Sequence, residues 1–169
     1  MSGAGGQTVP MPSDLPCPQR WFDDYEPGER FTFGSTTIDE AEIIEFGRKF
    51  DPQPFHIDPE AARHTVYGRL IASGWHTGSI MMKLLGEHLL GPSSMGSPGL
   101  DELRWLAPVH PGDRLTLVVE VLEMLPSRSK PDRGIVKMAH ELVNQHGATV
   151  VRSVANMMIA RRPQQDAEA

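Results

Sequence analysis

The stretch "LIASGWHTGSIMMKLLGEHLL", residues 70–90, sets the architecture that we expect for the whole chain. Its apolar residues leave only a narrow polar stripe when they are placed on a helix from about Gly74 to Leu90. The pair Gly91 and Pro92 ends that helix. A helix that is apolar on most sides has to be wrapped by other structure. We therefore expect one long, buried helix at the centre of the domain.

The segments around this helix alternate apolar and polar residues with a period of two, which is typical of half-buried strands. Runs rich in Gly, Pro, Asn and Asp separate these segments. The simplest packing is an antiparallel sheet that curls around the buried helix, an α+β arrangement called the hot-dog fold. The predicted strands are residues 29–38, 100–107, 113–125, 134–144 and 148–160.

Two helices are predicted between the first strand and the central helix. The first begins with a T-x-x-E capping pattern at Thr37 and Glu40 and runs to about Phe50, because the Asp-Pro pair that follows disfavours helical angles. The second helix is short, and Asp58 is its predicted N-cap. The chain between the two is expected to be a loop.

Length and composition indicate one globular domain. The chain has 169 residues, of which 39% are hydrophobic, and its 16 Gly and 15 Pro residues fit a loop-rich fold better than a helix bundle. We expect a single domain over residues 20–161, a flexible tail over 1–19 and a polar tail over 162–169. The net charge of −6 and the lack of a long basic stripe argue against nucleic acid as a partner.

Cysteine usage and hydropathy indicate where the protein works. Cys17 is the single cysteine, so no internal disulfide forms, which is typical of the reducing cytoplasm. The N-terminus has neither the charged start nor the apolar run of a secretory signal. No apolar run approaches the ~20 residues of a membrane span. We therefore expect a soluble, cytoplasmic protein without a membrane partner.

The segment "DPQPFH", residues 51–56, is the first candidate for chemistry. Pro52 and Pro54 stiffen the backbone, so the segment loses little entropy when it holds two titratable side chains in one geometry. Those side chains are Asp51 and His56, and a carboxylate beside an imidazole is a common acid/base pair. The alternative is an ordinary helix stop followed by a histidine without a catalytic role.

Ser73 and Gly74, at the start of the central helix, form the second candidate site. A helix N-terminus offers free backbone N–H groups and the positive end of the helix dipole. A glycine there lets a carbonyl oxygen approach the backbone, as in an oxyanion hole. The alternative is that Ser73 only caps the helix and Gly74 only relieves a tight entry into the core.

Other residues have weaker signals. His76 lies within one turn of Gly74 and is a candidate for contact with a substrate. Arg128 and Lys130 belong to a basic segment, "SRSKPDRG", that suits the phosphates of a ligand such as coenzyme A, although a solvated hairpin turn explains it slightly better. No Cys, His or carboxylate cluster has the spacing of a metal site.

Three separated motifs together resemble the MaoC-like dehydratase family, which includes the R-specific enoyl-CoA hydratases. The family pattern is roughly D-x-N-P-x-H-x-D-x-x-x-A, then a small residue and Gly at the entry to the central helix, then a P-V-x-x-G-D turn. The resemblance covers about residues 20–160. The motifs read Asp51-Pro52-Gln53-Pro54-Phe55-His56-Ile57-Asp58 with Ala62, then Ala72-Ser73-Gly74, then Pro108-Val109-His110-Pro111-Gly112-Asp113.

The resemblance implies a hot-dog fold, a homodimer or an assembly of dimers, and reversible hydration of a trans-2-enoyl-CoA to the (R)-3-hydroxyacyl-CoA. Coenzyme A then enters only as part of the substrate, and neither a further cofactor nor a metal is implied. By residue matching, Asp51 and His56 hold and activate water, and the N–H group of Gly74 binds the thioester carbonyl. The remaining residues expected beside the acyl-CoA substrate are Ser73, Gln53, Trp75, His76, Arg128 and Lys130.

The sequence departs from the family pattern at four places. Gln53 stands for the usual Asn, and Ser73 stands where many members carry His. Phe50 replaces a common Gly, and Met82 lies where some hydratases have Ser. These changes leave the Asp, His and Gly set intact, so they put the identity of the substrate in doubt more than the chemistry.

Two other functions compete with the hydratase. A hot-dog thioesterase would use a carboxylate to direct water at the thioester carbon. A non-catalytic module that binds acyl-CoA or acyl-carrier protein would keep the fold and the helix entry without needing Asp51 and His56. The intact spacing of that pair favours the hydratase over both.

Overall fold

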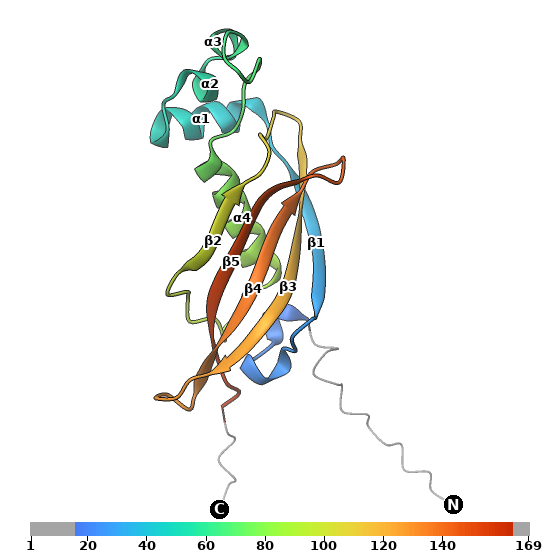
Figure 1. The fold of residues 1–169 in the computed structure, drawn as a ribbon, viewed down its shortest axis with the longest axis vertical. Helices are drawn as coiled ribbons and strands as arrows, with labels where there is room; N and C mark the ends of the chain where they lie inside the picture. Colours follow the sequence, from blue (N-terminus) through green and yellow to red (C-terminus); the bar gives the residue numbers. More distant parts are fainter. Residues whose placement is uncertain (1–15, 164–169) are drawn as a thin grey trace, which may run out of the picture.

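An antiparallel sheet of five strands forms the main body of the molecule, which the computed structural model describes over residues 16–163 (Figure 1). The strand order is β1-β3-β4-β5-β2. The expected α+β hot-dog fold is confirmed, because the sheet curves around one long helix. The strands are β1 (Arg30–Thr37), β2 (Leu100–Trp105), β3 (Arg114–Pro126), β4 (Arg133–Val143) and β5 (Thr149–Ala160).

The core lies between this sheet and the central helix α4 (Gly74–His88). Alternate residues of β3, β4 and β5 are buried, so one face of the sheet is apolar and faces α4. Ile80, Met81 and Leu84 are among the helix residues that fill this core. The sheet covers α4 incompletely, however, since Trp75 is 61% exposed and Met82 is 52% exposed. The expectation of a helix wrapped on most sides is therefore wrong along this side.

Three helices gather at one end of the sheet, where the N-terminus of α4 also lies (Figure 1). They are α1 (Glu40–Phe50), α2 (Pro54–Ile57) and α3 (Pro59–Arg63). α1 ends at Phe50 as predicted, but its N-cap is Asp39 and not Thr37, because the Asp39 carboxylate accepts the N–H of Glu42. α3 has the predicted cap, Asp58.

The opposite end of the sheet is closed by two 3-10 turns, η2 (Cys17–Gln19) and η3 (Phe22–Asp24). Cys17 is buried in the core, so the tail expected over residues 1–19 overlaps the packed domain at 17–19. Arg162 lies 2.8 Å from Asp24, so residue 162 is tied to the domain as well. Residues 1–15 and 164–169 of the two predicted tails lie outside the described residues. Between residues 16 and 163, no helix has both the length and the apolar character needed to cross a membrane.

Candidate active site

Two short helices bring Asp51 and His56 together. Asp51 is the C-cap of α1, and His56 is the third residue of α2, a helical turn that the sequence analysis treated as loop. Pro54 begins this turn, at a position where its missing N–H is not needed. The two helices can pack closely because of Gly47, where a Cβ would lie only 2.9 Å from the backbone oxygen of His56.

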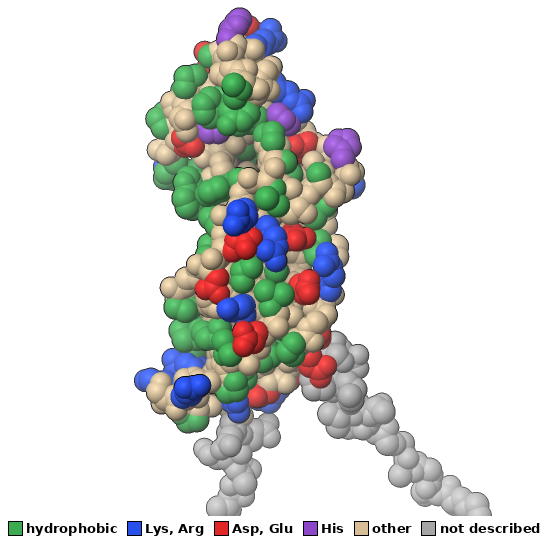
Figure 2. Space-filling model, viewed as in Figure 1, with side chains coloured by type: hydrophobic (Ala, Val, Ile, Leu, Met, Phe, Trp, Pro, Cys, Tyr) green, Lys and Arg blue, Asp and Glu red, His purple; other side chains and the backbone are tan. Residues whose placement is uncertain are grey.

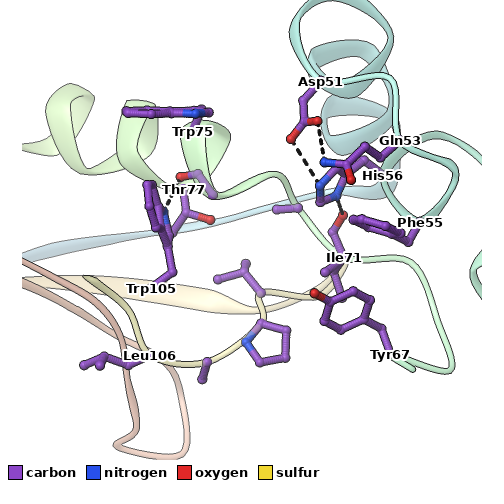
Figure 3. A pocket seen from close by; sticks show the side chains of 15 residues that line it. Asp51, Gln53, Phe55, His56, Tyr67, Ile71, Trp75, Thr77, Trp105 and Leu106 are labelled. Atoms are coloured by element: carbon purple, nitrogen blue, oxygen red, sulfur yellow. Dashed lines mark hydrogen bonds and ion pairs between the residues drawn. The ribbon is translucent and has the colours of Figure 1, made fainter. Parts of the chain in front are cut away.

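The imidazole of His56 is fixed on both sides (Figure 3). Its Nδ1 lies 2.8 Å from the backbone oxygen of Ile71, and its Nε2 lies 3.2 Å from Oδ2 of Asp51. Because a carbonyl oxygen only accepts hydrogen bonds, Nδ1 carries a proton and donates it to Ile71. Nε2 is therefore the nitrogen that exchanges a proton with Asp51 or with a molecule beside it. His56 is buried, although it also lines the cavity described below.

The Asp51 carboxylate has two further partners. Gln53 Nε2 donates to Oδ1 at 2.8 Å, and Ser73 Oγ donates to Oδ2 at 2.7 Å. Partial burial tends to raise the pKa of Asp51, but the hydrogen bonds from Gln53 and Ser73 and the charge of His56 outweigh burial and lower this pKa. Asp51 is thus held as a carboxylate, ready to accept a proton from a bound molecule.

The N-terminus of α4 faces the same space. Ser73 caps the helix by accepting the N–H of Trp75 at 3.3 Å. The N–H group of Gly74 has no acceptor among the described residues, as is usual in the first turn of a helix. The side-chain direction of Gly74 is filled by Trp105, whose indole N–H donates to the Gly74 oxygen at 2.7 Å. Only glycine fits at position 74 against Trp105, and the N–H group of Gly74 is available to a ligand.

A cavity of about 490 Å³ joins these groups (Figure 3). Asp51 and His56 lie at one side of it, and Trp75 and Trp105 lie at the other. The two tryptophan rings meet edge to face, with centroids 5.3 Å apart. The cavity thus combines a proton-transfer pair, a free helix N–H group and apolar walls. The lining residues are Asp51, Gln53, Phe55, His56, Tyr67, Ile71, Ala72, Gly74, Trp75, Thr77, Trp105, Leu106, Ala107, Pro108 and Val109.

The third sequence motif supports the wall of this cavity. Pro108 and Val109 line it, and the oxygen of Val109 accepts the N–H of Ala72 at 2.8 Å, just before the central helix. Gly112 has a φ of 87°, a left-handed conformation that favours glycine in the turn. Asp113 closes the turn by accepting the N–H of His110 at 2.8 Å. The motif therefore fixes the segment that leads into α4.

The structure corrects the expectations for three residues. His76 does not line the cavity: its ring stacks on Phe46, with centroids 4.7 Å apart, and its Nε2 lies 3.2 Å from Glu42. Arg128 and Lys130 belong to the turn between β3 and β4, at the end of the sheet opposite the cavity, where basic side chains gather in Figure 2. Within one chain, that turn is too far away to contact a ligand bound beside Asp51.

Ser73 has a different position from the one predicted, because it is fully buried and holds Asp51 without lining the cavity. The sequence analysis missed Trp105, Tyr67 and Thr77, which do line it. Trp105 lies three residues before the third motif, which begins at Pro108, and this nearness to the motif was the available signal. Tyr67 lies in a turn without a motif, and its ring packs at a tilt against Phe55, with centroids 5.1 Å apart.

The chain is similar to several known proteins. A family model described as "MaoC like domain" matches residues 24–144. The uncharacterized protein YdeM of Bacillus subtilis is 30% identical over 141 residues, which cover 83% of this chain and 99% of YdeM. An (R)-specific enoyl-CoA hydratase of Rhodospirillum rubrum is 30% identical over 109 residues, which cover 64% of this chain and 74% of the hydratase. The crystal structure of a MaoC-like dehydratase from Rhodospirillum rubrum aligns with a TM-score of 0.79 and 43% identity, over 85% of this chain and 98% of that chain.

Proposed function

Because this chain belongs to the MaoC-like domain family, we propose that it is a hydro-lyase that adds water reversibly to a trans-2-enoyl-CoA and forms the (R)-3-hydroxyacyl-CoA. The observation that carries this proposal is the Asp51–His56 pair in one cavity with the free N–H group of Gly74. The similarity to an (R)-specific enoyl-CoA hydratase supports the same reaction class. Coenzyme A is part of the substrate, and the absence of a further cofactor or metal and the cytoplasmic location stay predictions.

In the proposed reaction, water lies in the cavity beside the Asp51–His56 pair and contacts both the Asp51 carboxylate and Nε2 of His56. Asp51 takes a proton from the water as the oxygen bonds to the β-carbon of the enoyl group. The electrons of the double bond move toward the thioester oxygen, which becomes enolate-like and accepts a hydrogen bond from the N–H group of Gly74. A proton from the Asp51–His56 pair then reaches the α-carbon, and the reverse sequence removes water.

An assay that separates water addition from thioester cleavage tests this proposal. The purified protein is mixed with crotonyl-CoA and with longer enoyl-CoA thioesters, and the absorbance of the conjugated thioester is followed while free thiol is measured in parallel. Loss of conjugation without thiol release is expected. Thiol release would support a thioesterase instead, and no signal with any of these substrates would support a binding module.

Substitution of the pair tests the roles of Asp51 and His56. Asp51→Asn and His56→Ala are each expected to lower kcat by ~10²–10⁴-fold, because each removes one proton-transfer partner. Ser127→Ala, in the distant turn between β3 and β4, is the control. Circular dichroism and melting curves establish that the variants fold. Activity close to that of the unsubstituted protein in either folded variant would contradict the assignment.

We also propose that the protein acts as a homodimer joined along β2. β2 ends the strand order, so its outer edge has no partner strand among residues 16–163. Leu100 and Trp105 at the two ends of β2, and Leu106 directly after it, are each about half exposed. The exposed Trp75 and Met82 lie on α4. An unpaired strand edge can pair with another strand, and exposed apolar side chains beside it are typical of an interaction surface. A second copy related by a two-fold axis covers this surface and continues the sheet.

A further inference from the structure

A second cavity, of about 500 Å³, lies beside the candidate active site between α4 and the strands β2 and β5. Trp75 lines both cavities, so they share one wall. From Trp75 the second cavity follows α4 past Gly78 and Met81 to Leu85. Most of its lining is apolar, which suits a hydrocarbon chain whose thioester end lies at Gly74.

A buried polar pair interrupts this apolar lining. His140 of β4 and Ser153 of β5 are register partners, and each is only 2% exposed. Both residues line the cavity. Ser153 Oγ lies 3.3 Å from His140 Nδ1 and 3.5 Å from the sulfur of Met81. His140 Nε2 has no hydrogen-bond partner among residues 16–163. A buried imidazole nitrogen without a partner is unfavourable, so a ligand that supplies one gains affinity there.

The surroundings of His140 determine which ligand group suits it. Within the described part of the chain, no Lys, Arg, Asp or Glu lines this cavity, so a charged group would be buried without a counter-ion. Burial lowers the pKa of His140 to about 4, so the imidazole is neutral near pH 7. Nε2 then donates or accepts, depending on which nitrogen carries the proton. A hydroxyl group satisfies either form, because it both donates and accepts.

We propose that this cavity holds the acyl chain of the substrate and that His140 selects a chain carrying a hydroxyl group remote from the thioester. This inference rests on the proposed function, since it places the thioester at Gly74. Met81 is seven residues along α4 from Gly74, or about 10 Å at about 1.5 Å per residue. The hydroxyl group therefore belongs toward the far end of a medium-length acyl chain, not at the carbons that react.

A binding experiment without turnover tests the inference. Saturated octanoyl-CoA and a positional series of hydroxyoctanoyl-CoA isomers are titrated into the full-length protein by isothermal calorimetry, because saturated chains cannot be hydrated. At least one isomer with a remote hydroxyl group is expected to bind roughly 3- to 10-fold more tightly than octanoyl-CoA. This comparison uses the unsubstituted protein, so it does not depend on the folding of a variant.

Variants identify His140 as the source of the preference. His140→Leu is expected to bind octanoyl-CoA and the preferred isomer within about 2-fold of each other. Ser153→Ala, which keeps the imidazole but removes its hydroxyl partner, should weaken the preference less. His146→Gln, on an exposed histidine in the turn between β4 and β5, is the matched control and should keep it.

The outcomes separate this inference from the proposed function. A protein that hydrates enoyl-CoA but binds no hydroxylated isomer more tightly than octanoyl-CoA would overturn the inference alone. A preference that persists in a folded His140→Leu variant would also overturn it. Failure of every ligand to bind would overturn both. A protein that shows the hydroxyl preference without any hydratase activity would support the inference and contradict the hydratase.

Discussion

Ser73 links the central helix to the chemistry, because its hydroxyl group both caps α4 and donates to Asp51 at 2.7 Å. Hydrogen bonds to a carboxylate favour its charged form and lower its pKa. Ser73→Ala is therefore expected to raise the pKa of Asp51, so the acid limb of the pH profile of kcat/KM moves to higher pH. The value of kcat/KM at its optimum should also fall roughly 10-fold, since Asp51 loses one of its supports.

Measuring kcat/KM from pH 3 to pH 9 checks this prediction, because the pKa of Asp51 lies below its ordinary value of 3.8 in the unsubstituted protein. Loss of the cap costs about 1 kcal/mol of stability, so the variant is assayed well below its melting temperature. Ser127→Ala has no contact with Asp51 and is the control. An unchanged acid limb in folded Ser73→Ala would mean that Ser73 only caps the helix.

For single residues, the sequence predicts the proton-transfer groups better than it predicts the residues that hydrogen-bond to them and hold them in place. Asp51 and His56 are brought together by two prolines and a local turn, so the pair can be predicted from the sequence. Ser73 is 22 residues from Asp51, and their hydrogen bond depends on how α4 packs against α1. The neighbours of His140 likewise come from β3, β5 and α4, which are distant in the sequence, so no local pattern predicts its environment.

Close packing of α2 against α1 fixes the position of α2, and therefore of His56. A Cβ at Gly47 would lie 2.9 Å from the backbone oxygen of His56 and from the side chain of Ile57. Gly47→Ala is expected to push α2 away from α1 and to lower kcat by roughly 10- to 100-fold, because small misplacements of catalytic groups are costly. Overpacking should also cost about 1–3 kcal/mol of stability. Steady-state kinetics and urea unfolding measure the two effects.

Gly86 in α4 is the matched control, because it is an exposed glycine in a helix and a Cβ there meets no atom within 4 Å. Gly86→Ala is expected to stabilise the protein by about 1 kcal/mol and to leave kcat unchanged. Full activity in Gly47→Ala would show that α2 tolerates the displacement and that the tight contact is not needed for catalysis.

The elements themselves follow largely from periodicity, and the departures have local causes. The five strands appear where a period of two predicts them. The first helix starts at a different cap because Asp39 is nearer to its first turn than Thr37. The turn with Arg128 and Lys130 is a hairpin at the far end of two long strands, and strand length alone separates it from the site. Sequence patterns predict elements well, but distances between them depend on topology.

Burial of His140 couples the stability of the whole molecule to pH. Its pKa is about 4 in the folded protein, against an ordinary value of 6.5. The unfolded chain therefore takes up a proton as the pH falls below 6.5, and the folded protein does so only near pH 4. Stability contributed by neutral His140 is present above pH 6.5 and is lost as the pH falls toward 4. The loss approaches about 3 kcal/mol if the whole shift is realised.

Urea unfolding at several pH values between 7.5 and 4 measures this dependence in the unsubstituted protein and in His140→Leu. The variant should lose less stability over that range, while His146→Gln should behave like the unsubstituted protein. Asp51 and the other carboxylates titrate in all three proteins, so their contribution cancels in the comparison. Parallel curves for His140→Leu and the unsubstituted protein would contradict the role of His140.

If two chains pair along β2, charged substitutions at this edge should separate them. Leu100 begins β2 and Leu106 directly follows it, and each also lines one of the two cavities. Charged residues on an edge strand oppose pairing with another strand.

We expect light scattering to give the unsubstituted protein twice the chain mass of 18.7 kDa. The double variant Leu100→Lys and Leu106→Lys should give a single chain mass. Leu125→Lys, on an exposed leucine of β3 outside this edge, should remain dimeric. A single chain mass for the unsubstituted protein at micromolar concentration would rule out pairing along β2, and the two cavities would then open directly to water.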